Sequence, residues 1–129
     1  MRFSMPHLPQ EFDISDAWLK EAGFNGVWPA TASFKSSPGA ALIPLTEIEP
    51  VARFKTTPKD GGGFDRDRLV KILRRIISEA EIDPVPVMKL PYLDLSPSPY
   101  RYTVKDGYHR FYASIAARFS ELPAIIVNE

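Results

Sequence analysis

The chain has 129 residues, of which 44% are hydrophobic, enough to enclose one hydrophobic core, so we expect a single structural domain. Sixteen basic residues balance sixteen acidic ones, and no overall field draws the chain toward nucleic acid or anionic lipid. It contains no cysteine, which excludes disulfides, thiolate metal sites and sulfur nucleophiles. No apolar run has the length of a signal peptide or a membrane helix, and we expect a cytoplasmic protein without a membrane partner.

The first third of the chain predicts one short helix followed by irregular chain. The helix is expected from Asp13 to Ala22, with Ser15 or Asp13 as its cap and Gly23 as its stop. Residues 24–38 are expected to be irregular or to form a short edge strand on the core. The tryptophans of this region, Trp18 and Trp28, lack basic neighbours and are expected to pack rather than to stack on bases.

The middle of the chain predicts a strand and the clearest helix. Residues 41–46 form a short apolar segment, in which Pro44 is tolerable only at a sheet edge or a strand end. A helix is predicted from Asp65 to Ala80, with Asp65 as its cap. Its buried face is expected to carry the apolar residues that recur at helical spacing, namely Leu69, Ile72, Leu73, Ile76 and Ile77.

The last third predicts three strands and a second strong helix. The strands are expected at 84–90, 100–105 and 123–127, and the helix at 108–119. The helix should turn Tyr108, Phe111, Tyr112, Ile115 and Phe119 inward and leave Arg110 and Ser114 on another face.

The order of the elements favours an α+β fold, a small mixed sheet packed against two main helices, with a short N-terminal helix in front. We expect residues 1–40 to be an extension packed on a domain formed by residues 41–129.

The junction between the strand at 100–105 and the last helix is a candidate anion site. Asp106 and Gly107 end the strand, and the first amides of the helix, at the positive end of its dipole, are a natural seat for phosphate. Gly107 permits a sharp turn and a close approach of a ligand. Arg110 adds a forked cation, and His109 is either a phosphate ligand or general acid, or a histidine bonded to the strand end. Asp106 either binds a metal on the phosphates or only makes the turn.

The middle helix carries Arg68, Lys71 and Arg75 on one face, with Arg74 nearby. This row could follow a nucleic-acid backbone or meet an acidic partner. Interleaved acidic residues make a solvated face the simpler interpretation. The glycines at 61–63, before this helix, either close as a lid over a ligand or only connect the elements.

The stretch VKDGYHRFYASIAARFSELPAIIV, residues 104–127, combines a strand ending in D-G-x-H-R, a helix with a small residue and a proline that opens the next strand. Three upstream blocks accompany it: LIPLTEIEP at 42–50, FDRDRLVKILRRI at 64–76 and IDPVPV at 82–87. In this order the four blocks resemble the ParB and sulfiredoxin superfamily over roughly the last two thirds of the chain. The resemblance implies a ParB/sulfiredoxin-like fold.

The resemblance also implies a nucleotide pocket, for ATP or CTP with Mg²⁺, whose phosphates rest on the turn from Gly107 through Tyr108 to Arg110. The base would lie near the strand that contains Pro84 and Val85. Arg53 resembles an arginine that ParB-like proteins bring to the phosphates. An exposed arginine without a role in binding is an equally good interpretation of this residue.

Branches of the superfamily can be separated by single residues. Sulfiredoxins need a cysteine where this chain has Tyr108, so peroxiredoxin repair is excluded. The sequence ends two residues after its last expected strand, and we expect it not to be a complete partition protein. The related free-serine kinases place a catalytic glutamate where this chain has Ala52, and Glu49 is out of register. No catalytic residue is assigned from the sequence, and the candidates are His109, Asp106 and Glu49.

Two functions stay open at this point. In the first, a small enzyme binds a nucleotide and hydrolyses it or transfers a phosphoryl group. In the second, a non-enzymatic module with a vestigial pocket binds DNA or a protein, using the basic helix and an N-terminal extension whose aromatics look exposed. Nucleic acid is the less favoured partner, and a homodimer stays open.

Overall fold

The computed structural model describes residues 1–6, 10–50, 63–91 and 99–127, and these form three α-helices, one short 3₁₀ helix and seven strands. In chain order the elements are β1 (Arg2–Ser4), β2 (Glu11–Asp13), α1 (Asp16–Ala22), β3 (Ala41–Pro44), η1 (Leu45–Glu47), β4 (Ile48–Glu49), α2 (Arg66–Ile77), β5 (Val85–Lys89), β6 (Tyr102–Val104), α3 (Tyr108–Ala116) and β7 (Glu121–Ile126).

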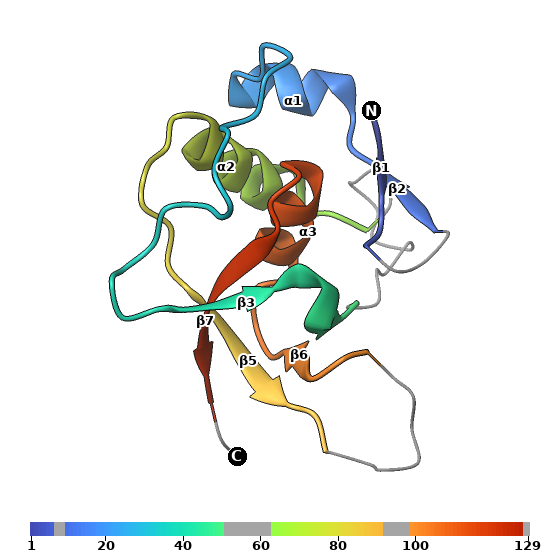
Figure 1. Ribbon diagram of the computed structural model, residues 1–129. Helices are drawn as coiled ribbons and strands as arrows, with labels where there is room; N and C mark the ends of the chain where they lie inside the picture. Colours follow the sequence, from blue (N-terminus) through green and yellow to red (C-terminus); the bar gives the residue numbers. More distant parts are fainter. Residues whose placement is uncertain (7–9, 51–62, 92–98, 128–129) are drawn as a thin grey trace.

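Five strands form one mixed sheet in the order β3-β7-β5-β6-β4. The pairs β5–β7 and β4–β6 are parallel, and the pairs β3–β7 and β5–β6 are antiparallel. The helices lie together on one side of this sheet, where α3 packs on α2 and α1 packs on α2 in turn (Figure 1). The predicted α+β class, with a mixed sheet, two main helices and a short N-terminal helix, is therefore confirmed.

Of the three prolines in the described strands of this sheet, Pro44 and Pro86 lie where no hydrogen bond between strands is lost. Pro44 is the last residue of β3, an edge strand, as predicted. Pro86 lies in β5, the central strand, where its carbonyl accepts from the amide of Lys105 at 2.9 Å. Proline has no N–H, and an N–H at this position would point to the same side as the carbonyl, beyond the end of β6. The pairing of β5 with β7, on the other side of the strand, therefore loses no hydrogen bond.

The helix caps follow the predicted chemistry. Ser15 caps α1, its Oγ accepting from the amide of Ala17 at 3.2 Å, and Gly23 ends the helix with φ +94°. Asp65 caps α2, its Oδ1 accepting from the amide of Arg68 at 3.2 Å. The prediction of a helix from Asp13 is wrong at its start, because Asp13 lies in β2, where it pairs with Arg2 of β1.

The β1–β2 hairpin and β4 were not predicted, because they are too short to show a periodic pattern. Each hairpin strand has three residues and buries one of them, and β4 has only two residues. Phe3 and Phe12 are those buried residues, with ring centroids 5.5 Å apart. The expectation of exposed aromatics in the N-terminal extension is therefore wrong for this pair. The division of the chain into 1–40 and 41–129 stays a prediction.

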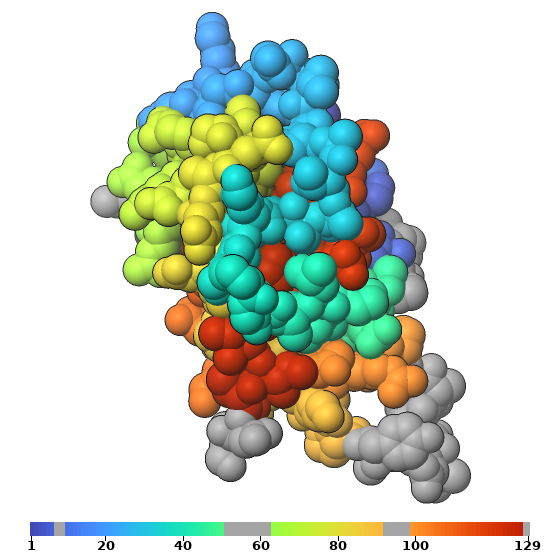
Figure 2. All heavy atoms as spheres, turned by 60° about the vertical axis from the view of Figure 1, so that its left-hand side comes forward, coloured from blue at the N-terminus to red at the C-terminus, as the bar shows by residue number. Residues whose placement is uncertain are grey.

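The irregular segment after α1 is held to the core by backbone bonds. The carbonyl of Lys35 accepts from the amide of Ile82 at 2.8 Å, and that of Ala32 accepts from the amides of Ser120 and Glu121. In Figure 2 this segment, blue to teal, runs as a strip between the yellow-green surface of α2 and the red surface of the last third of the chain. The prediction of irregular chain here is confirmed.

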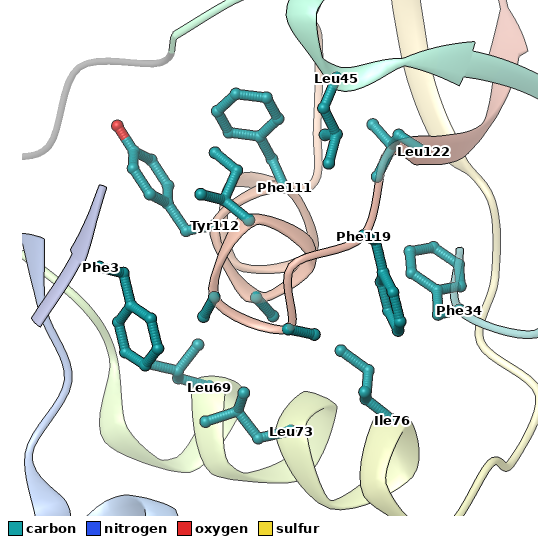
Figure 3. Close-up of a cluster of buried hydrophobic side chains, with 14 of the residues drawn as sticks. Phe3, Phe34, Leu45, Leu69, Leu73, Ile76, Phe111, Tyr112, Phe119 and Leu122 are labelled. Atoms are coloured by element: carbon teal, nitrogen blue, oxygen red, sulfur yellow. The ribbon is translucent and has the colours of Figure 1, made fainter. Parts of the chain in front are cut away.

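The core lies between α2, α3 and the sheet (Figure 3). Leu69, Leu73 and Ile76 are buried as predicted, whereas Ile72 and Ile77 are only partly buried and Val70 is buried instead. Trp18 and Trp28 pack against this core, as expected. On α3 the buried side chains are Phe111, Tyr112, Ala113, Ser114, Ile115 and Ala116, with Tyr108 partly buried.

Ser114 corrects the sequence interpretation, which placed it on an outer face. Its side chain is fully buried, and its Oγ has no hydrogen-bond partner in the described part of the chain. A buried hydroxyl without a partner loses the hydrogen bonds it makes to water in the unfolded chain, and this loss opposes folding.

We expect Ser114→Ala to raise the melting temperature by about 4 °C, since removing the hydroxyl relieves about 1 kcal/mol in a chain of this size. Ser15→Ala makes the same chemical change at the cap of α1 and is expected to cost about 1 kcal/mol. Thermal unfolding of both variants checks the opposite signs. A loss of stability in Ser114→Ala as large as in Ser15→Ala would mean that the hydroxyl is bonded.

Candidate anion-binding site

A cleft of about 550 Å³ lies between α2, the chain before β5 and the turn from β6 into α3. Basic side chains line it from two sides. Three of them come from α2 and two from the β6–α3 region: Arg68, Lys71, Arg75, Lys105 and Arg110. Asp83 and Asp106 are the acidic residues of the lining, so the wall carries an excess of positive charge.

The turn into α3 has the predicted geometry. Gly107 has φ +123° and precedes α3, and the first bond of the helix runs from the amide of Phe111 to the carbonyl of Gly107 at 2.9 Å. The amides before Phe111, that of Arg110 included, therefore have no acceptor within the helix. They lie at the positive end of the helix dipole.

The groups that lie closest to the place where a Cβ of Gly107 would be are side chains of the protein itself. A Cβ at this position would lie 2.8 Å from Cγ1 of Val85 and 3.1 Å from Nη2 of Arg110. Glycine was expected here to let a ligand approach the backbone, but the first neighbours it admits are a core valine and a guanidinium.

Arg110 is held by one edge of its guanidinium. Nη1 donates to the carbonyls of Asp83 and Pro84, both at 3.0 Å, and so joins α3 to the start of β5. Nε and Nη2 make no hydrogen bond within the described residues. A guanidinium carries five N–H donors, so three of them are left for a ligand in the cleft that Arg110 lines.

His109 also lines the cleft, but one of its nitrogens is bonded to the protein. Nε2 accepts from the backbone amide of Asp65 at 2.9 Å. An accepting Nε2 requires the neutral ring with its proton on Nδ1. A contact to phosphate from His109 would therefore have to use the other nitrogen, or follow release of Asp65.

The acidic candidates separate into two groups. Asp106 is exposed on the cleft wall, whereas Glu49 lies in β4, in register with Thr103 of β6, and does not line the cleft. Within the ranges that the structure covers, no three acidic or histidine side chains gather to hold a metal ion. The donor set fits an anion. Magnesium carried on phosphates needs one or two carboxylates, which Asp83 and Asp106 would supply.

The basic row of α2 was the feature that sequence reasoning undervalued. Arg68, Lys71 and Arg75 were interpreted as a solvated face, and the structure brings them to the same cleft as Lys105 and Arg110. Their spacing put them on one helix face, but no local signal said that this face looks toward the turn.

Three arginines outside the cleft are paired with carboxylates, whereas the basic residues of the cleft are not paired within the described residues. Arg2, Arg66 and Arg101 each lie beside a carboxylate: Arg2 contacts Asp13, Arg66 contacts Glu21, and Arg101 contacts Glu47. The five basic residues of the cleft form no ion pair within the described residues, and Arg75 reaches only the carbonyl of Glu81 at 3.0 Å. Among the described residues, Asp83 and Asp106 therefore offset only part of the positive charge of the cleft.

The remaining candidates do not join this site. Val85 is fully buried, and neither it nor Pro84 lines the cleft. The apolar part of the lining comes from Ile72, Ile82 and Val104, together with Tyr108. Arg53 lies outside the described residues, as do the glycines at 61 and 62.

Neither the protein-family models nor the curated proteins compared with this sequence gave a match. Among the described helices, none has the length and apolar character needed to span a bilayer.

Proposed function

We propose that the chain binds a phosphate-bearing ligand in the cleft, and that a nucleotide such as ATP or CTP is this ligand. The observation that carries the proposal is the convergence of five basic side chains, none of them ion-paired within the described residues, on the N-terminus of α3. Guanidinium groups and helix amides are the donors that proteins use for phosphate.

The cleft favours one orientation of a nucleotide. Its phosphates would accept hydrogen bonds from the first amides of α3, from Nε and Nη2 of Arg110, and from Lys105. Its base would lie on Ile72, Ile82 and Val104 rather than on the strand of Pro84 and Val85, which does not line the cleft. The resemblance to the ParB and sulfiredoxin superfamily supports the same ligand class and stays part of the proposal.

The same residues supply little for catalysis beyond charge. Cations and helix amides can stabilise a transferring phosphoryl group, but hydrolysis or transfer also needs a group that orients the nucleophile. Of the three candidates, Glu49 lies outside the cleft and His109 has Nε2 bonded to Asp65. Asp106 is the carboxylate candidate on the cleft wall, and binding is therefore proposed ahead of turnover.

A second candidate function is binding of nucleic acid along α2, which would make the chain a regulatory module. Arg68 and Lys71 are exposed and lie one turn apart on the helix, as phosphate contacts would require. The affinity for DNA would then fall steeply as salt is raised, and a flat response over a salt series would remove this alternative.

Calorimetric titration with ATP, CTP and pyrophosphate tests the proposed function. We expect the unaltered chain to bind, and Arg110→Ala to weaken binding by about 10- to 100-fold, the range that charge-assisted hydrogen bonds support. Lys89 is exposed and lies outside the cleft, so Lys89→Ala is the control and should bind as the unaltered chain does. No binding of any of the three ligands by the unaltered chain would contradict the proposal.

A further inference from the structure

The two sides of the cleft are joined by a hydrogen bond that crosses 44 residues of sequence. His109, in the first turn of α3, accepts through Nε2 from the backbone amide of Asp65 at 2.9 Å. Asp65 is the N-cap residue of α2, directly before Arg66, the first residue of the helix. The side that carries the helix amides and the side that carries the basic row are thus connected through one imidazole.

The bond acts on the part of α2 that holds the cleft cations. Oδ1 of Asp65 accepts from the amide of Arg68 at 3.2 Å, so the residue held by His109 is also the cap of the first turn. Arg68 ends that turn and Lys71 lies in the next one, and both line the cleft. The position of these two charges relative to α3 therefore depends on where Asp65 sits.

Phe64 supports the same junction from the apolar side. It is fully buried, and its ring centroid lies 5.6 Å from that of Tyr108, 6.1 Å from that of His109 and 5.4 Å from that of Tyr112. The ring contacts fix the chain one residue before Asp65, and the imidazole then fixes the direction in which the amide of Asp65 points. Sequence interpretation offered a bond to the strand end, whereas the observed acceptor bond goes to another helix.

We propose that His109 is a positioning residue, which aligns the basic row of α2 with the N-terminus of α3 and does not itself supply charge to the anion. This role rests on the proposed function of the cleft. It requires the neutral ring, because an imidazolium has two donors and no acceptor for the amide of Asp65.

Two variants separate positioning from direct contact. His109→Ala removes the acceptor, whereas the Oε1 of glutamine in His109→Gln reaches about as far as Nε2 and can accept from Asp65. For each we would measure amide hydrogen exchange at Asp65, affinity for pyrophosphate and the dependence of that affinity on salt. The amide of Ala17, bonded to Ser15 at the cap of α1, is the internal reference for exchange.

We expect His109→Ala to exchange the Asp65 amide about five- to tenfold faster, and to bind pyrophosphate several-fold more weakly with an unchanged salt slope. His109→Gln should restore both properties. A weaker affinity that also depends less on salt, and unchanged exchange at Asp65, would show that His109 is a charged ligand and overturn the proposal. Faster exchange with unchanged affinity would also overturn it.

The outcome for the unaltered chain keeps the two proposals apart. If it binds pyrophosphate and His109→Ala behaves in either of the contradicting ways, only the role of His109 fails. If it does not bind pyrophosphate, the proposed function fails, and the role of His109 in binding fails with it, whatever the exchange at Asp65 shows.

Discussion

Gly107→Ala is expected to destabilise the chain by about 3 kcal/mol and to weaken pyrophosphate binding. A φ of +123° costs a residue with a side chain about 1–2 kcal/mol, and overpacking a filled site costs about another 1–3 kcal/mol. The added methyl would lie 2.8 Å from Cγ1 of Val85, a fully buried side chain that cannot move aside freely. Thermal unfolding should show a melting temperature lower by roughly 12 °C.

Gly26→Ala is the matched control for this effect. Gly26 has a similar φ of +98°, but a Cβ there would have no neighbour within 4 Å. It should therefore lose only the backbone part, about 1–2 kcal/mol. If both variants lost the same stability, the contact between Gly107 and Val85 would not be the cause, and the account of the turn would be wrong.

Reversing two charges on α2 is expected to have the largest effect on binding. The double variant Arg68→Glu with Lys71→Glu should lower the affinity for pyrophosphate by about 100-fold, since each reversal replaces an attraction of about 0.7 kcal/mol by a repulsion of similar size. Both side chains are exposed and form no ion pair within the described residues, so the melting temperature should change by no more than about 2 °C.

The control has the same change of net charge at another place. Lys35 and Lys89 are also exposed, unpaired within the described residues, and outside the cleft. Reversing both should alter the affinity by no more than about twofold at physiological salt, because neither side chain lines the cleft and salt screens exposed charges. An equal loss in the two double variants would mean that net charge, and not the cleft, attracts the anion.

Local chemistry made much of the fold predictable. Asp65 and Ser15 were placed as caps by residue type, and the period of Leu69, Leu73 and Ile76 gave the buried face of α2. The turn at Gly107 was predicted because glycine followed an apparent strand and preceded a helical pattern. Each of these predictions depends on residues within two or three turns of one another.

What could not be predicted depends on contacts between distant segments. His109 bonds to a residue 44 positions away, and Arg110 to carbonyls 26 and 27 positions away. Helical spacing placed Ser114 on another face than the inward residues, whereas the packing of α3 buries it. The basic row of α2 could be recognised as part of a site only from the tertiary structure, in which it lines the same cleft as the N-terminus of α3.

The central claim is that the cleft receives phosphate at the start of α3, and titration of pyrophosphate into the isotopically labelled chain, followed by amide and guanidinium resonances, tests it most directly. We expect saturable shifts at the amides of Gly107 to Phe111 and at Nε of Arg110, with smaller shifts at Arg68 and Lys71. Shifts spread evenly over exposed lysines such as Lys35 and Lys89, without saturation and without a change at Arg110, would contradict the account.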